Sequence, residues 1–369
     1  MAPPPDRGTQ PLDRHILPVR ERYSGIFTKL LRVLTDAVRT ALTAPPFSEV
    51  QRREEYRVRS AARRAHEAMG AIGIAAAQQA VLATAERGSQ QAIVELRRLG
   101  HDPLSPIDSR ATRLIQDELA GRLHAAHLAT LREPEDIYRR IISQAALLAP
   151  GDDGTRRLPV AQHALDRFAE QGITGFVDRS GRRWDITSYV EMATRTAASR
   201  AYTDAHSEWL LANGRHLVYI TDVPGECEKC RPFEGAVLRL DDGPLGERFN
   251  VTRDRDGTPD TVTVSGTLAA ARAAGLLHPA CRHRPIEFEP GMWLPAGHAD
   301  PEGEAARAHL RYLERGVRRW KLREAAALDD LARKAARRKV RAWQAAIRQH
   351  VATAPVSRVP RREQIDRAR

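Results

Sequence analysis

The sequence contains very few cysteines and aromatic residues. Three cysteines in 369 residues are too few, and an odd number, for the disulfide framework of a secreted scaffold. Aromatic residues make up 5% of the chain and hydrophobic residues 42%, so much of the apolar content is alanine and leucine. These two residues favour helices over β-sandwiches. We therefore expect reduced thiols and a predominantly helical protein.

Long apolar runs and the common catalytic motifs are also missing. We find no uninterrupted apolar stretch of about 18 residues and no apolar signal core near the N-terminus, and we expect no membrane span and no secretion signal. The sequence has no phosphate-binding glycine loop, dinucleotide-binding glycine motif, serine nucleophile elbow or H-E-x-x-H motif. These absences argue against many familiar enzyme classes, and we predict that the protein is not an enzyme.

Positive charge is in clear excess over negative charge. The chain has 59 lysines and arginines against 47 acidic residues, a formal net charge of +12 and a pI of about 10.2. An excess of this size favours contact with a polyanion such as DNA or RNA. The alternative is a solvated, arginine-rich surface with no such partner.

Apolar periodicity and helix-breaking residues predict an α+β fold. Mostly α-helical N- and C-terminal regions enclose a small central α+β domain. Before the central domain, apolar residues recur every four positions from Ile26 to Leu42, and a second helical run is softened near Gly70–Gly73. The predicted regions are a flexible N-terminus (1–20), a helical domain (21–150), the central α+β domain (155–295), a basic helical region (302–352) and a disordered basic tail (354–369).

The central domain is predicted from short strand patterns and turn residues. A hairpin is expected over 171–184 and a helix over 185–213. The apolar centre of HLVYIT predicts a strand at 216–221. Further strands are expected at 236–240, 261–264 and 284–289, with a short helix at 267–275.

Two cysteine- and histidine-rich segments form the most informative motif. Cys227 and Cys230 make a C-x2-C pair directly after a predicted strand, and fifty residues separate Cys230 from Cys281 in the segment HPACRH. Thiolates and imidazoles at such spacings are typical of a structural zinc site with four tetrahedral ligands. We predict that Cys227, Cys230, Cys281 and His283 bind structural zinc, with His278 as the alternative fourth ligand.

Two plainer interpretations of the cysteines are open. They are either ordinary buried thiols, or Cys227 and Cys230 form a disulfide, which the lack of an export signal disfavours. The presence of the second Cys/His segment favours a metal over both.

A third interpretation is a zinc-dependent nucleobase deaminase. His206-Ser207-Glu208 precedes the C-x2-C pair, and deaminases use H-x-E followed by P-C-x-x-C. The match fails because no proline directly precedes Cys227, because His206 lies inside a predicted helix, and because the second Cys/His segment would have no role. We interpret His206 and Glu208 as solvated helix residues.

The segment 302–352 is predicted to be helical and is strongly basic. Leu310, Leu313, Val317 and Trp320 form an apolar seam that requires a partner helix. Around this seam, basic residues outnumber acidic ones, which favours sequence-independent contacts with nucleic-acid phosphates. The candidate contact residues are Arg318, Arg319, Lys321, Arg323, Arg333, Lys334, Arg337, Arg338, Lys339 and Arg341.

Three motifs together resemble the phage minor capsid protein 2 family, which is related to the Mu F-like head morphogenesis proteins. They are the segment GITGFVD followed by GRRW and YVEM within 172–192, the Cys/His segments, and the segment RYLER followed by RRWK within 311–321. Their order and spacing match the family over about residues 160–350.

The resemblance implies a structural protein present in few copies in the head of a tailed phage. It implies a position near the portal vertex and inner capsid, with roles in head assembly and in handling packaged DNA. The implied partners are the portal protein, the major capsid or scaffolding protein and packaged DNA, in the host cytoplasm during assembly and then in the virion. The alternative function is that of a zinc-supported, sequence-independent DNA-binding protein.

The resemblance also bears on the fourth ligand and on the C-terminus. In the wider Mu F-like group the position of His283 is often a cysteine, which favours His283 over His278 as a ligand. Some relatives carry an additional C-terminal toxin domain with enzymatic activity. This chain ends in a basic helix and tail, so that activity is not expected.

Overall fold

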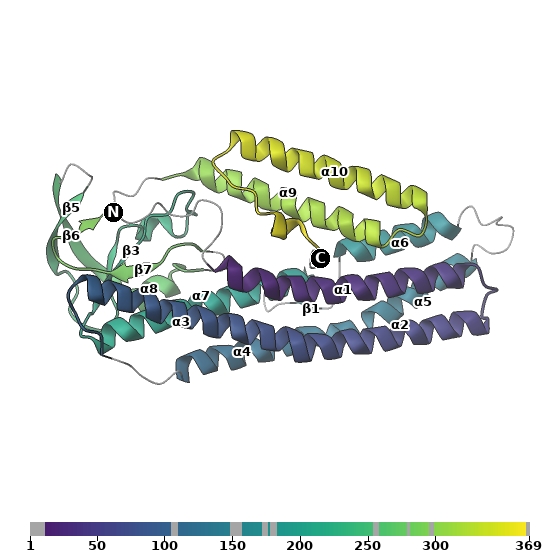
Figure 1. Cartoon of the computed structure of the whole chain (residues 1–369), viewed down its shortest axis with the longest axis horizontal. Coiled ribbons are helices and arrows are strands. Elements are labelled where there is room, and N and C mark those ends of the chain that lie inside the picture. The colour runs from purple at the N-terminus through teal and green to yellow at the C-terminus, as the bar shows by residue number, and fades with distance from the viewer. Residues whose placement is uncertain are drawn as a thin grey trace.

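The protein is elongated, with long helices along most of its length and a small β-sheet at one end (Figure 1). The computed structural model describes residues 12–104, 110–147, 157–171, 176–177, 183–253, 258–278, 281–294 and 299–366. The main bundle consists of α1 (Asp13–Leu42), α2 (Glu49–Ala68), α3 (Ala75–Arg98), α4 (Arg110–His127), α5 (Glu133–Leu147), α6 (Arg157–Gln171) and α7 (Ile186–Ala212).

Helix α1 begins earlier than the sequence predicted. Residues 13–20, predicted to be flexible, form its first turns, and Ile16 and Leu17 are buried there. The apolar stripe of the helix extends through these residues, so the first turns bury apolar surface as the rest of the helix does. Buried Asp13 accepts a hydrogen bond from Arg362 and lies 2.9 Å from Arg195, which ties this end of α1 to distant parts of the chain.

A short π-helix, Met69–Ile74, joins α2 to α3 without interrupting the helical run. The glycine-rich sequence predicted a softened helix here, and the wider helical turn is the form that it takes. The resulting run Glu49–Arg98 is long and apolar enough by composition to cross a membrane, which the sequence analysis did not anticipate. Its buried side chains face α1, α4 and α7, so its composition is also that expected of a bundle core helix.

Helices α6 and α7 complete the bundle core rather than a separate central domain. Phe168 of α6 packs against Phe27 of α1 with ring centroids 5.7 Å apart, and Val190 of α7 is fully buried in the same core. The predicted division near residues 150–155 is therefore wrong as a boundary between cores. Both helices present an apolar face to α1–α5, and only the chain from residue 217 onward enters the sheet.

The larger sheet contains six strands in the order β7-β3-β4-β6-β5-β8. Its strands are β3 (Leu217–Ile220), β4 (Val237–Arg239), β5 (Arg248–Arg253), β6 (Thr258–Thr267), β7 (Pro285–Glu287) and β8 (Trp293–Leu294). The predicted strands correspond to β3, β4, β7 and part of β6, whereas β5 and β8 were not predicted. The smaller hairpin pairs β1 (Phe176–Val177) with β2 (Arg183–Trp184), and its predicted Ser-Gly turn lies outside the described residues.

The central strand β3 positions the two Cys/His segments. It pairs antiparallel with β4 on one side and with β7 on the other, with Tyr219 opposite Ile286. The first segment follows β3 and the second precedes β7, so both lie at the same end of the sheet. The short helix α8 (Leu268–Ala273), capped by Thr267, leads the chain from β6 back to that end.

Helices α9 (Pro301–Ala325) and α10 (Asp330–Thr353) form an antiparallel pair above the bundle (Figure 1). The predicted seam packs as expected, because Leu310, Leu313 and Val317 of α9 are buried against Val340 and Ile347 of α10.

The C-terminal tail is packed, contrary to the predicted disorder. In the described part of the tail, Arg362, Glu363 and Ile365 are buried. The backbone carbonyl of Ile365 accepts hydrogen bonds from Ser24 and Thr28 of α1 at 2.7 and 3.0 Å. Composition alone suggested disorder, but the tail forms hydrogen bonds and ion pairs with α1 and α9.

Candidate metal centre and basic surface

The C-x2-C segment forms a tight turn that directs two thiols toward the second segment. The backbone N–H groups of Cys230 and Arg231 both donate to the carbonyl of Cys227, at 3.0 and 3.1 Å. Gly225, at φ 65°, precedes the turn and lies so close to Gly303 at the start of α9 that a Cβ atom there would come within 2.8 Å of its backbone. The turn is therefore wedged between the sheet and α9.

The structure brings all five predicted ligands together. Cys227, Cys230 and His278 form one group, and Cys230, Cys281 and His283 form a second; the donor atoms within each group lie within 4.8 Å of one another. Buried Cys230 is common to both groups. The cysteines are all free, so no Cys227–Cys230 disulfide is present.

The separations of the donor atoms agree with tetrahedral zinc geometry. Zn–S and Zn–N bonds of about 2.3 and 2.0 Å place two sulfurs about 3.8 Å apart, and a sulfur and a nitrogen about 3.5 Å apart. The Sγ atoms of Cys230 and Cys281 are 3.5 Å apart, and Cys281 Sγ lies 3.3 Å from His283 Nδ1. Cys227 Sγ lies 2.8 Å from His278 Nε2, closer than two ligands of one ion would be. Cys227 belongs to the group with His278 and not to the group with Cys281 and His283, so one ion held by Cys227, Cys230, Cys281 and His283 would require Cys227 to move toward the second group.

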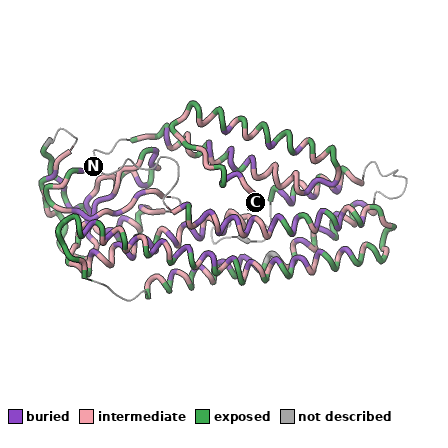
Figure 2. The backbone as a smooth tube through the Cα atoms, viewed as in Figure 1, coloured by how far each residue is buried: buried purple, intermediate pink, exposed green. Residues whose placement is uncertain are grey.

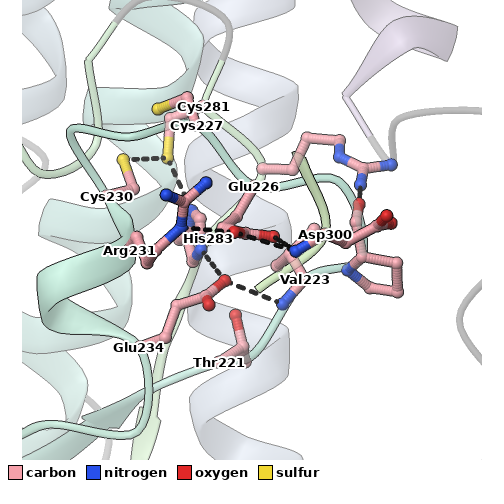
Figure 3. A network of polar contacts seen from close by, with 12 residues as sticks. Thr221, Val223, Glu226, Cys227, Cys230, Arg231, Glu234, Cys281, His283 and Asp300 are labelled. Carbon is pink, nitrogen blue, oxygen red and sulfur yellow. Dashed lines mark hydrogen bonds and ion pairs between the residues drawn. The ribbon is translucent and has the colours of Figure 1, made fainter. Parts of the chain in front are cut away.

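His283 is held by a buried carboxylate. Its Nε2 lies 2.6 Å from Glu234 Oε1, and both side chains are almost fully buried (Figure 3). The same oxygen accepts a hydrogen bond from the backbone of Val223. A carboxylate behind a ring nitrogen orients a ligating histidine and leaves the opposite nitrogen for a metal. Here that opposite nitrogen is Nδ1, which faces Cys281.

Hydrogen bonding within the cluster shifts the thiol pKa values in opposite directions. The contact with Cys281 raises the pKa of Cys230, and burial adds to this effect. The same contact lowers the pKa of Cys281, because Cys230 can donate its proton to the Cys281 thiolate. Burial raises the pKa of Cys227. A bound metal ion would replace these protons, since the thiolate is the ligating form.

Two arginines, Arg282 and Arg307, lie beside the cluster. Among the described residues, no carboxylate lies within ion-pair distance of either one. Arg282 donates to the carbonyl of Pro224, and Arg307 lies beside Gly225. Burial and the neighbouring Arg307 together lower the pKa of Arg282 to about 10. The thiol groups of Cys281 and Cys227 favour the charged forms of Arg282 and Arg307, respectively. Three thiolates and one neutral imidazole around Zn²⁺ would carry one net negative charge, which these cations would balance.

Glu226 connects the metal-site turn to the C-terminal helices. Its buried carboxylate accepts the backbone N–H of Asp300, the N-cap of α9, and a hydrogen bond from Arg231 at 2.7 Å (Figure 3). Burial alone would raise the pKa of Glu226, but these hydrogen bonds outweigh it and the net effect is a lower pKa. Sequence analysis did not single out Glu226 or Glu234, because each lies near a cysteine without any motif of its own.

His206 lies apart from the cysteines, and its predicted solvation is wrong. Its ring is fully buried, and its Nε2 is 2.8 Å from Glu95 Oε2 on α3. The same carboxylate oxygen accepts the backbone N–H of Glu287 in β7, so the pair links the bundle to the sheet. The His206–Glu95 contact therefore has a structural role, and His206 is not grouped with Cys227 and Cys230 as a deaminase would require.

The predicted basic residues on α9 are mostly engaged within the protein. Arg323 lies 2.8 Å from Glu170 and above the ring of Trp320, and Arg319 shares Glu170 at 3.8 Å. Lys321 donates to Gln364, and Arg318 donates to the carbonyl of Arg362. These four side chains hold the bundle and tail together, so they are poor candidates for contacts with nucleic acid.

The outer face of α10 remains free. Lys334, Arg338, Arg341 and Arg348 are exposed and recur at helical spacing, whereas Ala336, Val340 and Ile347 are buried. Figure 2 shows exposed and less exposed positions alternating along this helix. We call these four residues the outer stripe; none of them forms an ion pair with another described residue. Of the other predicted contacts on α10, Arg333 pairs with Asp330, Arg337 pairs with Glu324, and Lys339 lies 5.9 Å from the Trp320 ring centroid. Sequence analysis missed Arg348, which helical periodicity would have found.

Comparison with known proteins identifies the family. The family model described as phage minor capsid protein 2 matches residues 78–352, which is most of the chain. A "Structural protein" of Lactococcus phage LL-H is 28% identical over 230 residues, covering 58% of this chain and 57% of that protein. The chain thus spans little more than half the length of this relative, and no solved structure gives a significant match. The family match extends from α3 through α10, including the sheet and both Cys/His segments, and the chain belongs to the phage minor capsid protein 2 family.

Proposed function

We propose that this structural protein of the phage virion is stabilised by a zinc ion, associates with the portal vertex and inner capsid, and contacts packaged DNA through the outer stripe of α10. The convergence of five Cys/His ligands from two distant segments carries the zinc proposal. The unpaired basic stripe carries the DNA proposal. The association with portal and capsid rests on the family alone.

In the zinc proposal, Cys227, Cys230, Cys281 and His283 hold the ion. Glu234 supports His283 because it fixes the ring with Nδ1 toward Cys281. With four protein ligands, no position is left for water, so the ion is structural. It joins the loop after β3 to the loop before β7, and Glu226 carries that constraint to α9.

Elemental analysis tests the zinc proposal. Protein purified without chelator should contain one zinc per chain, and Cys281→Ser and His283→Asn should lose it together with thermal stability. His278→Asn is the matched histidine control and should keep the metal. Metal-free wild-type protein, with a melting temperature unchanged by Cys281→Ser, would contradict the proposal. Loss of zinc in His278→Asn but not in His283→Asn would assign the fourth position to His278.

The DNA proposal predicts contacts with phosphates rather than with bases. The outer stripe is arranged along one helix face, and lysine and arginine side chains on such a face bind duplex phosphates without reading sequence. The rest of the predicted basic set is directed into the protein, so the contact should depend on few residues. Binding should therefore be sequence-independent and steeply dependent on salt.

A salt titration with fluorescently labelled duplex DNA tests this surface. Arg338→Gln combined with Arg341→Gln should reduce the slope of log K against log salt by about 2, because each lost phosphate contact removes about 0.9. The control is Arg53→Gln combined with Arg57→Gln on α2, at the opposite edge of the molecule in Figure 1, which makes the same change in charge. An equal loss in both double variants would refute a specific role for the stripe.

Association with the head is tested by co-purification. Tagged protein expressed during phage assembly should recover the portal protein together with major capsid or scaffolding protein. Its recovery from assembled heads at far fewer copies than the capsid protein would support the low copy number. Its absence from purified heads and from portal complexes would refute the assembly proposal.

A further inference from the structure

A cleft rich in arginine lies where α1, the start of α7, α9 and α10 meet. Its volume is about 270 Å³, and its walls include Arg20, Arg315 and Arg318, with Trp343 and Ile365 contributing apolar surface. One water molecule occupies about 30 Å³ in the liquid, so the cleft can hold a group of several heavy atoms together with its hydration water. Neither the metal centre nor the outer stripe of α10 contributes to it.

The three arginines lack carboxylate partners within ion-pair distance among the described residues. Arg20 is 1% exposed and donates to the backbone carbonyls of Arg361 and Arg362, while its Nε atom has no hydrogen-bond partner. Arg318 donates to that same carbonyl of Arg362. Arg315 is exposed at the rim. Backbone carbonyls satisfy hydrogen bonds but do not neutralise the positive charge.

The acidic residues that line the cleft make their closest contacts with other groups, although Glu191 also attracts Arg20 and Arg318 at longer range. Glu170 lies 2.8 Å from Arg323, and Glu191 lies 3.3 Å from Arg195. Asp185 caps α7 by accepting the backbone N–H of Ser188 at 3.0 Å. With Arg319, four arginines line the cleft against three carboxylates, so the lining has an excess of one positive charge.

The surroundings make this excess unfavourable without an anion. Burial and repulsion from Arg318 together lower the pKa of Arg20 to about 10, even though Glu191, Glu21 and Glu314 oppose the shift. Although Arg315 is exposed, partial desolvation at the rim lowers its pKa, and Arg318 adds to the effect. The positive end of the 27-residue helix α7 points to the same place, since Ile186 and Thr187 line the cleft.

We propose that the arginine cleft binds a phosphate dianion, either inorganic phosphate or the phosphate monoester of a nucleotide. Guanidinium groups match phosphate oxygens in geometry and bind them through paired, charge-assisted hydrogen bonds. A dianion neutralises more of the three arginine charges than a single carboxylate would. The ligand would also bridge α9 to α1 and α7, because Arg20 comes from α1 and the other two arginines come from α9.

Isothermal titration calorimetry of the full chain at low ionic strength tests the proposal. Inorganic phosphate and dAMP are the probes, and deoxyadenosine is the uncharged control. Arg315→Gln should weaken binding about tenfold, equivalent to 1.4 kcal/mol. This substitution leaves the fold intact because Arg315 is exposed and unpaired, and an unchanged unfolding curve verifies that point. Arg338→Gln on the outer stripe is the matched control and should leave binding unchanged.

The results distinguish the possible sources of the anion. Similar affinities for phosphate and dAMP would identify free phosphate as sufficient, whereas dAMP binding about tenfold tighter would identify a nucleotide. No heat of binding up to about 10 mM phosphate or dAMP would overturn the proposal. Equal weakening by Arg315→Gln and Arg338→Gln would also overturn it, as would binding of a glutamate-rich peptide in preference to both probes.

Discussion

Replacement of Gly88 by alanine should force α3 and α7 apart. An ideal Cβ atom at Gly88 lies 2.2 Å from the backbone oxygen of Tyr202 and 3.2 Å from the backbone nitrogen of His206. Both atoms belong to the backbone of α7, so no side-chain rotation relieves the contact. The helices must separate by about 1 Å to restore a normal carbon–oxygen distance in a close-packed interior.

The expected loss of stability can be estimated from two opposing effects. Overpacking costs typically 1–3 kcal/mol, and a clash with backbone belongs at the upper end, about 3 kcal/mol. Alanine in a helix interior gains about 1 kcal/mol over glycine. We therefore expect Gly88→Ala to lower the free energy of unfolding by about 2 kcal/mol. Gly121 is exposed on α4 and has nothing within 4 Å of a new Cβ, so Gly121→Ala should raise the free energy of unfolding by up to about 1 kcal/mol.

Urea unfolding followed by circular dichroism measures both variants against the wild type. The difference between the two variants, about 3 kcal/mol, isolates the contact because the helix propensity gain is common to both. Equal stabilities of Gly88→Ala and Gly121→Ala would show that α3 and α7 are not in backbone contact at Gly88. That result would also remove the support for the position of Glu95 and His206 between the bundle and the sheet.

Two further predictions concern buried charge. Arg362→Met should cost about 3 kcal/mol, because it leaves Asp13 buried with only part of its charge compensation. Arg361→Met should cost less, because the Arg361 side chain is half exposed and water can reach the carboxylate of Glu21 once it is removed. Equal losses in urea unfolding would contradict this difference. Burial, and then repulsion from His66 and His124, lowers the pKa of His127 to about 4. Between pH 6.5 and 4 the unfolded chain therefore binds more protons than the folded protein does. The free energy of unfolding should fall by about 2–3 kcal/mol as the pH decreases through that window. His127→Gln should reduce this slope, and an identical slope in the variant would rule His127 out as its source.

Local patterns in the sequence predicted most of the elements and the meeting of the two Cys/His segments, whereas their binding of a metal stays a prediction. The apolar stripe from Ile26 to Leu42 predicts a helix because a four-residue spacing keeps side chains on one face. The C-x2-C pair and the HPACRH segment each place their ligands within one turn. Adjacent strands then suffice to bring the two segments together, and the structure has this arrangement. Strand β5 was missed because its alternation is weak, with only Val251 buried.

Features that depend on distant partners could not be predicted in the same way. His206 has the helical context of a solvated residue, but Glu95, 111 positions away, pairs with it in the interior. The tail has a disordered composition, yet Arg362 pairs with Asp13 from 349 positions away. The basic residues of α9 resemble those of α10 in sequence, and only packing against Glu170 and the tail distinguishes them.

The sequence by itself determined that this is a largely helical, basic member of the phage minor capsid protein 2 family with two converging Cys/His segments. Periodicity, composition and ligand spacing are properties of neighbouring residues, so a single chain read in order is enough to detect them. Only the tertiary structure decided which charges remain available for a partner. Burial and pairing depend on residues far apart in the chain, and they leave the outer stripe free and the arginine cleft positively charged.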